Sequence, residues 1–560
     1  MADRSKRNGS VARDGGQSWT IHGQRLPWVV LALLMGVATA AADVKLPALI
    51  GDNMVLQQGR QVAIWGTADA GEQVTVSLGK QKKTAAAGAD GQWNVKLGPL
   101  KKGGPLEMVV AGRNTITIHN VLMGEVWVCS GQTNMDGTLL GRGRSGGVMN
   151  AEQEDAAANY PLLRLFVVKK AVAGKPQTDV QGQWVVATPE TVGNFSAVGY
   201  FFGRDLHQAM KFPVGLIGSS YFDTEGEAWT GDAVLQADPA LKVVADSWQQ
   251  KIAEFPHVLE QFEQKLGDPQ KVMELQEWEK AAEEAEANGK VASAIPDKLA
   301  LAIPNVPKDP RSSRRRDAAV WNAMVAPLTS YAIAGVIWYQ GESNAEFPYQ
   351  YRKLFPAMIQ QWRSSWGEGD FPFLFVQLTN YSRGFRFPDV WPTTRESQAT
   401  ALALPKTGMA VAMDIGDHQS MFPKNKQEVG RRLALAAEGI AYGRKIEYQG
   451  PTFKSMRVDN GTVRLQFTHV AGGLVVHGES LKGFVVAGED QKVFPAEAQI
   501  EGTEVVLSSP QVAKPVAVRY AWANDPVCTL YNKAGLPAPQ FRTDDWTVSL
   551  QTLVRTVASW

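Results

Sequence analysis

Two parts of the chain show short runs in which apolar and polar residues alternate. Residues 61–65 and 74–78 are examples near the N-terminus, and Gly-containing turn sequences separate the runs there. Similar short runs return after Tyr448. Alternation of this kind predicts strands with one buried face. We therefore expect an N-terminal β-sandwich at residues 43–122 and a β-rich C-terminal domain at residues 448–560.

Continuous apolar runs replace this alternation in the middle of the chain. Residues 125–129, 335–340 and 373–377 each form such a run, and a polar loop follows it. Helical patterns lie between the runs, at residues 351–366 and 426–442 among others. Buried strands that alternate with helices predict a parallel sheet covered on both faces. The central fold class is therefore α/β, with three layers in the order α/β/α.

The α/β domain is expected in two pieces, residues 123–234 and 318–447. The stretch between them, residues 235–317, is rich in Glu, Lys, Gln and Ala, which predicts helices inserted into the domain. The insertion ends in the basic run Arg314-Arg315-Arg316. A short basic run of this kind is usually a solvated turn, and we interpret it so.

The first 42 residues have the pattern of a targeting segment. Basic residues precede an apolar run from Leu26 to Ala42, which closes on small residues that fit an A-x-A cleavage site. We expect a signal peptide, with an uncleaved membrane anchor as the alternative. Either form places the folded part outside the cytoplasm, secreted or periplasmic. No other stretch of the sequence is long and apolar enough to cross a membrane.

Composition narrows the classes of function. The formal net charge of +1 argues against a nucleic-acid-binding protein, which would carry a basic face. We interpret the two cysteines, Cys129 and Cys528, as free buried thiols, although the sequence leaves their pairing open. No cluster of His, Asp and Glu has the spacing of a metal site, so we expect no metal and no other cofactor.

Four loops concentrate small and hydrogen-bonding residues, and we name them blocks one to four. In a parallel sheet the carboxyl ends of the strands gather at one edge, where ligands bind. Four such loops in one α/β domain therefore predict a shared pocket. Block one is residues 129–135, block two 215–229, block three 338–344 and block four 414–426.

In their order and residues, the blocks resemble those of the sialate O-acetylesterase family, which are SGNH hydrolases. Matching segments run from Leu46-Pro47 near the start to residues 541–546 near the end, and the resemblance covers about residues 44 to 546. The resemblance implies an SGNH-type fold and an acetylated sugar or glycan as the partner, notably O-acetylated sialic acid. It also implies ester hydrolysis by a Ser in block one. A His in block four would be the base, an Asp two residues earlier would orient it, and backbone N–H groups with a block-three Asn would hold the oxyanion.

Blocks one and four depart from the family pattern at the reacting groups. The family's Gly-Gln-Ser-Asn-Met is residues 131–135 here, with Thr133 in the position of the nucleophile. The family's Asp-Ile-His is residues 420–422 here, so that Ser420 and Phe422 take the positions of the missing Asp and His. Phenylalanine accepts no proton, so the expected general base is lost. His418 is the one nearby histidine, and it is the candidate for a replacement base.

The other blocks keep part of the pattern. Asn344 matches the oxyanion-hole Asn of block three. In block two, Phe222-Asp223 replaces a family Gly pair, and a carboxylate beside a developing oxyanion is expected to destabilise it. Four further polar residues of blocks one and three are expected to bind a ligand. These are Gln132, Asn134, Gln340 and Glu342.

Three hypotheses for the function follow from this sequence. The first is a carbohydrate-binding pseudoenzyme, a sialate O-acetylesterase-like protein whose esterase activity is impaired or lost. The second is an active acetylesterase that uses Thr133 as nucleophile and His418 as base. The third is a non-catalytic scaffold module. The first has priority because several changes coincide at one site, and loss of one triad member already removes most of the catalysis.

Overall fold

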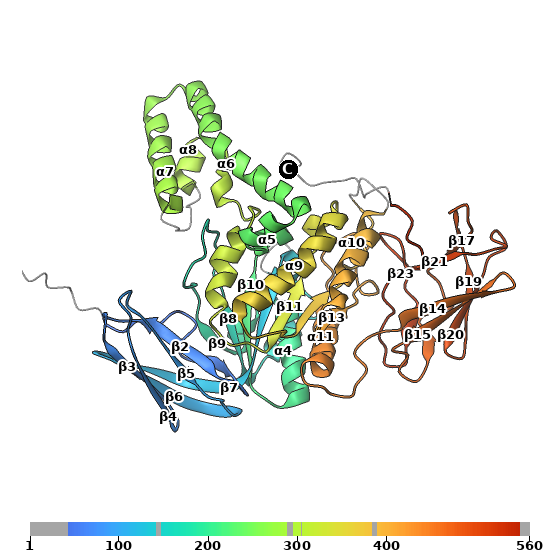
Figure 1. Cartoon of the computed structure of the whole chain (residues 1–560), viewed down its shortest axis with the longest axis horizontal. Coiled ribbons are helices and arrows are strands. Elements are labelled where there is room, and N and C mark those ends of the chain that lie inside the picture. Colours follow the sequence, from blue (N-terminus) through green and yellow to red (C-terminus); the bar gives the residue numbers. More distant parts are fainter. Residues whose placement is uncertain (1–42, 142–146, 288–294, 304, 384–388, 549–560) are drawn as a thin grey trace, which may run out of the picture. The chain divides into compact units, whose positions relative to one another are not determined.

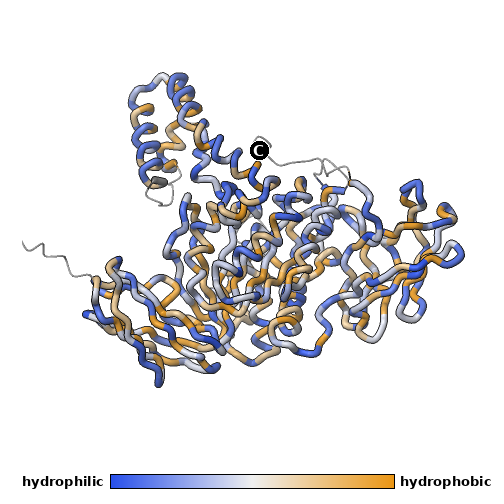
Figure 2. Tube along the Cα trace, viewed as in Figure 1, coloured by the Kyte–Doolittle hydropathy of each residue, from blue (hydrophilic) through white to orange (hydrophobic). Residues whose placement is uncertain are grey.

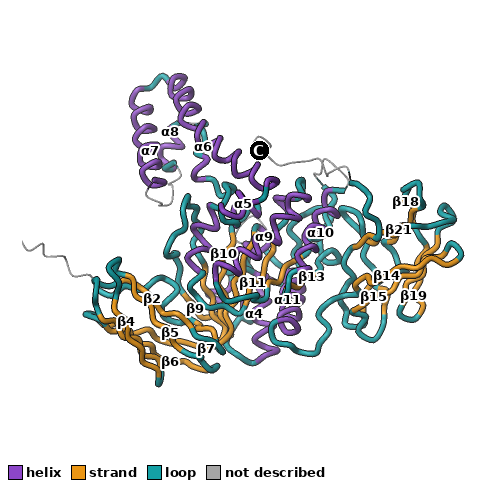
Figure 3. Tube along the Cα trace, viewed as in Figure 1, coloured by secondary structure: helices purple, strands orange, loops and turns teal. Residues whose placement is uncertain are grey.

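A computed structural model gives the architecture and confirms the α/β fold class, with β-rich regions at both ends (Figures 1 and 3). The expected leader at residues 1–42 lies outside the residues that the structure describes. The described residues are 43–141, 147–287, 295–303, 305–383 and 389–548.

The central sheet has the strand order β13-β12-β11-β7-β10-β8-β9. Neighbouring strands are parallel along this path, except that β8 and β9 are antiparallel. All three continuous apolar runs of the sequence lie in this sheet, in β7, β11 and β12. The strands are β7 (Thr115–Gly131), β8 (Tyr160–Val167), β9 (Trp184–Ala187), β10 (Val214–Ser220), β11 (Gly335–Tyr339), β12 (Phe373–Val376) and β13 (Thr407–Ala410).

Both faces of the sheet are buried, and this explains why its strands are apolar without alternation. In β11, Trp338 packs into one core with Phe355 and Trp362 of helix α9 (Pro348–Trp366). Its neighbour Ile337 points to the opposite face, into a second core that helices α4 (Ala197–Met210) and α11 (Lys426–Ile440) share. Helices therefore cover both faces, and the domain has the expected three layers (Figure 1).

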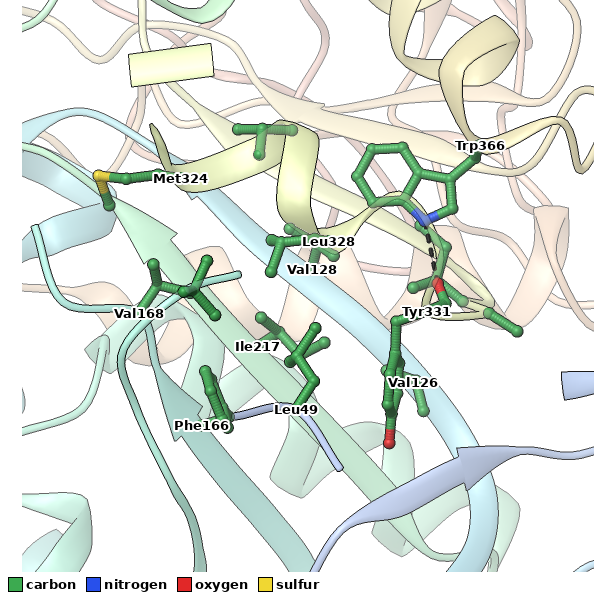
Figure 4. Close-up of a cluster of buried hydrophobic side chains, with 14 of the residues drawn as sticks. Leu49, Val126, Val128, Phe166, Val168, Ile217, Met324, Leu328, Tyr331 and Trp366 are labelled. Carbon is green, nitrogen blue, oxygen red and sulfur yellow. Dashed lines mark hydrogen bonds between the residues drawn. The ribbon is translucent and has the colours of Figure 1, made fainter. Parts of the chain in front are cut away.

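The core on the α9 face continues into the N-terminal region. Leu49 packs there with Val126 and Ile217 of the central sheet (Figure 4). Tyr331 connects the two regions by hydrogen bonds, because its hydroxyl donates to the Val55 carbonyl at 2.7 Å and its own carbonyl accepts from Trp366 Nε1 at 3.0 Å. The N-terminal strands therefore share one hydrophobic core with the α/β domain.

Strand β7 runs through the expected domain boundary at residue 122 without a break. Its first half pairs with β6, its middle with β1, and its second half with β10 and β11. The N-terminal region therefore holds the start of a strand whose end carries block one. The other N-terminal strands are β1 (Val55–Gln57), β2 (Val62–Thr67), β3 (Gln73–Leu78), β4 (Gln81–Ala86), β5 (Gln92–Leu97) and β6 (Gly103–Ala111).

The expected helical insertion is formed mainly by a long helix, α6 (Pro239–Leu266), followed by α7 (Pro269–Ala287). The Asp238 side chain caps α6 by accepting the Ala240 N–H, and Gly267 ends it in a left-handed conformation. Hydrophilic and hydrophobic residues mix along both helices (Figure 2). The other α-helices of the described residues are α1 (Thr133–Asp136), α2 (Ala151–Ala156), α3 (Pro189–Val192), α5 (Asp232–Ala237), α8 (Asp297–Ala302) and α10 (Val390–Ala399).

Short antiparallel strands make up the region after Tyr448 and form small sheets over a core that Val411 and Met413 of the α/β domain also join. Cys528 lies here, half-buried, and Cys129 is buried in β7; both thiols are free. Among the helices of the described residues, none combines the length and apolarity of a membrane span. The strands are β14 (Thr452–Asp459), β15 (Thr462–Thr468), β16 (Leu474–Val476), β17 (Phe484–Ala487), β18 (Val493–Pro495), β19 (Glu497–Glu501), β20 (Glu504–Ser508), β21 (Ala517–Tyr520), β22 (Leu530–Asn532) and β23 (Phe541–Arg542).

Candidate functional site

Thr133 stands at the carboxyl end of β7, where block one turns from the strand into helix α1. The turn depends on Gly131, because a Cβ there would lie 2.2 Å from the Tyr339 carbonyl oxygen of the neighbouring strand. Thr133 is 6% exposed, and its Oγ1 accepts the backbone N–H of Asp223 at 3.1 Å. Block two therefore touches the nucleophile position directly. This N–H is the one hydrogen bond that the described part of the chain gives to Thr133 Oγ1.

Block four reaches the same place through its backbone. The Met421 carbonyl accepts a hydrogen bond from Asn134 Nδ2 at 2.9 Å, which fixes the loop beside block one. Ser420 Oγ accepts the Phe422 N–H at 3.1 Å, so the hydroxyl at the position of the missing Asp stabilises the backbone of its own loop. Phe422 is partly buried. Phe422, where the resemblance places the base, therefore lies on a loop fixed beside block one, and its ring takes up no proton.

His418 lies on a tight turn of block four, between Asp417 and Ser420, which form an isolated β-bridge. Its side chain is 58% exposed, and its Nδ1 lies 3.6 Å from the Asp525 carboxylate. The contacts of the described residues include none between His418 and Thr133. The structure therefore gives His418 an acidic partner, but places it away from the nucleophile position.

Asn134, Glu342 and Lys426 form a buried polar network that joins blocks one, three and four. Asn134 donates from Nδ2 to Glu342 Oε1, and its Oδ1 accepts from Lys426 Nζ. Burial raises the pKa of the Glu342 carboxyl. Burial also lowers the pKa of Lys426 to about 7, against an opposing effect of Glu342. Lys426 is the first residue of α11, where the helix dipole adds to the cost of a positive charge. Lys426 is not among the site residues predicted from the sequence, since nothing in block four indicated that this lysine is buried.

The neutral form of Lys426 predicts a pH-dependent stability. An unfolded lysine keeps its proton up to about pH 10.4. Between about pH 7 and 10 the unfolded chain therefore binds more protons than the folded chain, and the free energy of unfolding rises with pH. Lys426→Met keeps the length of the side chain but has no titrating group. We therefore expect its free energy of unfolding to rise less with pH than that of the wild type. Denaturant unfolding across this pH range measures it, with the exposed Lys265→Met as control. Equal slopes in wild type and Lys426→Met would contradict the prediction.

Gln340 and Asn344 of block three, in the loop after β11, form hydrogen bonds with other residues of the protein. Gln340 is fully buried; its Nε2 donates to Asn344 Oδ1 at 2.7 Å and its Oε1 accepts the Tyr351 hydroxyl at 2.8 Å. Asn344 also accepts the Gly226 N–H at 2.9 Å, and its Nδ2 donates to Glu227 at 2.8 Å. We therefore no longer expect Gln340 to contact a ligand. Asn344 anchors block two to block three, and its use as an oxyanion donor stays a prediction for its second amide hydrogen.

Gln132 is also turned inward. It is 3% exposed, and its Oε1 accepts the Ser343 N–H at 3.3 Å. Asn134 is fully buried within the network described above. Of the four expected ligand-binding residues, Glu342 alone is partly exposed as a whole residue. Its Oε2 is nevertheless buried, and it has no hydrogen-bond partner among the described residues. The structure thus brings the predicted site residues together, but most of them bond to one another.

The Phe222-Asp223 pair of block two is held by cations. Asp223 has a left-handed backbone (φ 58°), a conformation that favours glycine and that aspartate tolerates. Its carboxylate pairs with Arg314 at 2.6 Å and with Arg315. The Arg314 guanidinium also lies 4.5 Å from the centre of the Phe222 ring, and the Lys170 ammonium 5.1 Å from it. The expected negative charge at this site is therefore neutralised by two arginines.

The basic run is a turn, as expected, but Arg314 and Arg315 are half-buried and paired rather than simply solvated. They lie 91 and 92 residues after Asp223 in the sequence and reach it only in the folded chain. Arg316 is itself 8% exposed. Within the described residues, no group of three His, Cys, Asp or Glu side chains is placed to hold a metal ion.

Comparison with known proteins identifies the relatives of this chain. A family of carbohydrate esterases, the sialic acid-specific acetylesterases, matches residues 313–438. A sialate O-acetylesterase from Rattus norvegicus is 31% identical over 92% of this chain and 97% of its own length. One from Homo sapiens is 29% identical over 92% of this chain and 96% of its own.

Among solved structures, a carbohydrate acetylesterase from Xanthomonas citri aligns with a TM-score of 0.73 and 34% identity. The alignment covers 90% of this chain and all of that one. The match thus extends over the N-terminal strands, the α/β domain and the C-terminal strands together. Identity at this level over nearly the whole length shows common ancestry and not only a shared fold. The chain therefore belongs to the sialate O-acetylesterase family of carbohydrate esterases.

Proposed function

We propose that this protein binds acetylated glycans outside the cytoplasm and that its ester hydrolysis is impaired or lost. The observation that carries the proposal is Phe422 at the position of the catalytic base, on a loop that Asn134 ties to block one. A serine or threonine hydroxyl is a weak nucleophile unless a base takes its proton. Thr133 Oγ1 receives a hydrogen bond from the Asp223 N–H and has no contact with a basic side chain in the described structure.

Two further features support the loss of hydrolysis. The hydroxyl oxygen of Ser420, at the position of the orienting Asp, accepts a hydrogen bond from the Phe422 N–H. The Asp223 N–H, which stands where a Gly of the family pair would be, is bonded to the Thr133 hydroxyl in the resting structure. A ligand oxyanion would compete with that hydroxyl for the same donor. Removal of one triad member typically leaves only about 10³–10⁴-fold acceleration over water.

The second candidate is an active acetylesterase with Thr133 and His418. The observation in its favour is the Asp525 carboxylate, 3.6 Å from His418 Nδ1, which would orient the imidazole as the third member of a triad does. This candidate requires the block-four turn to move, because His418 is exposed and has no contact with Thr133 among the described residues.

An esterase assay separates the two candidates. The purified protein is assayed with 4-nitrophenyl acetate and 9-O-acetylated sialic acid. We expect Thr133→Ala and His418→Ala to change the rates of hydrolysis less than about twofold, because these two residues do not act together as nucleophile and base. The exposed His119→Ala serves as a control for histidine loss. If both site variants abolish turnover while His119→Ala does not, the active candidate is correct and the proposal is overturned. A glycan-binding screen without any ligand would favour the scaffold hypothesis instead.

A further inference from the structure

A cavity of about 760 Å³ lies between the helical insertion and block two. Helix α6 contributes Trp248 and Lys251, helix α7 contributes Trp278, and the segment 307–315 forms a further wall. Tyr221 and Asp223 of block two also line it. A volume of this size suits a ligand of a few sugar units, since small-molecule sites have about 300–1,000 Å³.

The lining of the cavity is positively charged. Lys251 and Lys308 are exposed, and neither forms an ion pair among the described residues. The two acidic groups of the lining, Asp223 and Asp309, each have an arginine partner, and Asp309 bonds Arg311 at 2.9 Å. The acidic groups are thus neutralised and the lysines are not. Arg314 also lines the cavity, and its Nε is buried without a hydrogen-bond acceptor in the described structure.

Aromatic side chains supply the apolar part of the wall. Trp248 and Trp278 are 3% and 8% exposed, so their positions are fixed by packing. The Lys251 ammonium lies 5.6 Å from the Trp248 ring, which holds the cation at the cavity surface. Fixed aromatic rings beside a few charged donors are typical of sites that bind a ligand with apolar faces and an anionic group.

Asp223 connects this cavity to the candidate functional site. Its backbone N–H bonds Thr133 Oγ1, while its carboxylate lies in the cavity wall between Arg314 and Arg315. A ligand in the cavity would therefore lie next to the nucleophile position, separated from it by one residue.

We propose that this cavity binds a carboxylated sugar unit of an acidic glycan, with the carboxylate on Lys251 and Lys308 and the sugar ring against Tyr221, the partly exposed aromatic residue of the lining. The glycan part rests on the proposed function. The anionic part rests only on the charge of the cavity, and binding here requires no turnover at Thr133. Uronic acids and sialic acids share the carboxylate, so both are tested.

Calorimetric titration of the full chain at low salt tests the proposal, with trigalacturonic acid, disialic acid and neutral maltotriose as probes. We expect at least one acidic sugar to bind, maltotriose to bind at least about tenfold more weakly, and the difference to shrink as salt screens the charges. Lys251→Gln with Lys308→Gln is expected to weaken the acidic sugar about tenfold. Both lysines are exposed, so the double variant is expected to fold, and Lys265→Gln on the same helix α6 is the matched control.

Four outcomes would overturn the proposal. One is equal binding of maltotriose, another is an affinity that the double variant leaves unchanged, and the third is no binding of any probe. Inorganic sulfate that displaces the acidic sugar at equal concentration would show an anion site without sugar recognition, and it would also overturn the proposal. Esterase activity is measured separately, in the wild-type and Thr133→Ala chains. Failure of the proposed function would appear as turnover that Thr133→Ala abolishes, whereas failure of the cavity proposal would appear in the sugar-binding measurements.

Discussion

Restoring the family residues around Thr133 is expected to raise kcat/KM for 4-nitrophenyl acetate by about 10²-fold or more. The changes are Thr133→Ser, Ser420→Asp and Phe422→His, with Phe222→Gly and Asp223→Gly added in a second variant. The Met421 carbonyl is already bonded to Asn134, so a histidine at position 422 starts on a loop held beside block one. A triad supplies orders of magnitude of acceleration that its fragments do not, because its members act as one unit.

The two variants separate the contributions of the base and of block two. The Asp223→Gly change frees Arg314 and Arg315 from their carboxylate, so the triad-only variant is needed to show the effect of the base alone. Each single substitution is expected to gain less than about tenfold, since an incomplete unit contributes little. The matched control carries Ala at position 133 with all other changes. A folded triad variant with no gain over this control would show that position 422 does not reach position 133.

The fold was predictable where burial on both faces leaves a continuous apolar run. Gly335-Val336-Ile337-Trp338-Tyr339 was expected as a strand and is β11, because each face of the sheet is covered by helices. The helix expected at 351–366 begins earlier, at Pro348, where a proline suits the first turn of a helix. The boundary expected at residue 122 falls inside β7, since one strand serves two sheets there. Period and length of a strand are visible in a sequence, but its pairing partners are not.

The candidate site was predictable as a set of loops but not as a set of contacts. The blocks do meet, as the bond between Asn134 and the Met421 carbonyl shows. The sequence did not indicate that Gln340 would form its hydrogen bonds with Asn344 and Tyr351. It also did not indicate that Arg314 would pair with Asp223, 91 residues earlier in the chain. Such pairings depend on which side chains the fold buries, because a buried polar group forms hydrogen bonds with the groups that lie close to it.

The second large effect concerns Arg395 of helix α10, which joins the α/β domain to the C-terminal region. It is fully buried, and burial lowers its pKa to about 9. Its guanidinium donates to the carbonyls of Leu378 and Thr379 after β12, both at 3.0 Å. It also donates to the carbonyls of Ala523 and Asn524, at 2.9 and 2.8 Å. One side chain thus satisfies four backbone acceptors from two parts of the chain that are far apart in sequence.

Arg395→Met is expected to lower the free energy of unfolding by about 3–5 kcal/mol, because it fills similar volume but leaves several buried carbonyls without a donor. Arg457→Met, at an exposed arginine bonded to Glu504, is the control and is expected to cost less than about 1 kcal/mol. Denaturant unfolding measures both. Asp525, the acidic partner of His418, directly follows the segment that Arg395 holds, so the variant is also expected to loosen that pair. A loss below about 1 kcal/mol in Arg395→Met would mean that water or other donors satisfy these carbonyls, and that the C-terminal region is held to the α/β domain by apolar packing instead.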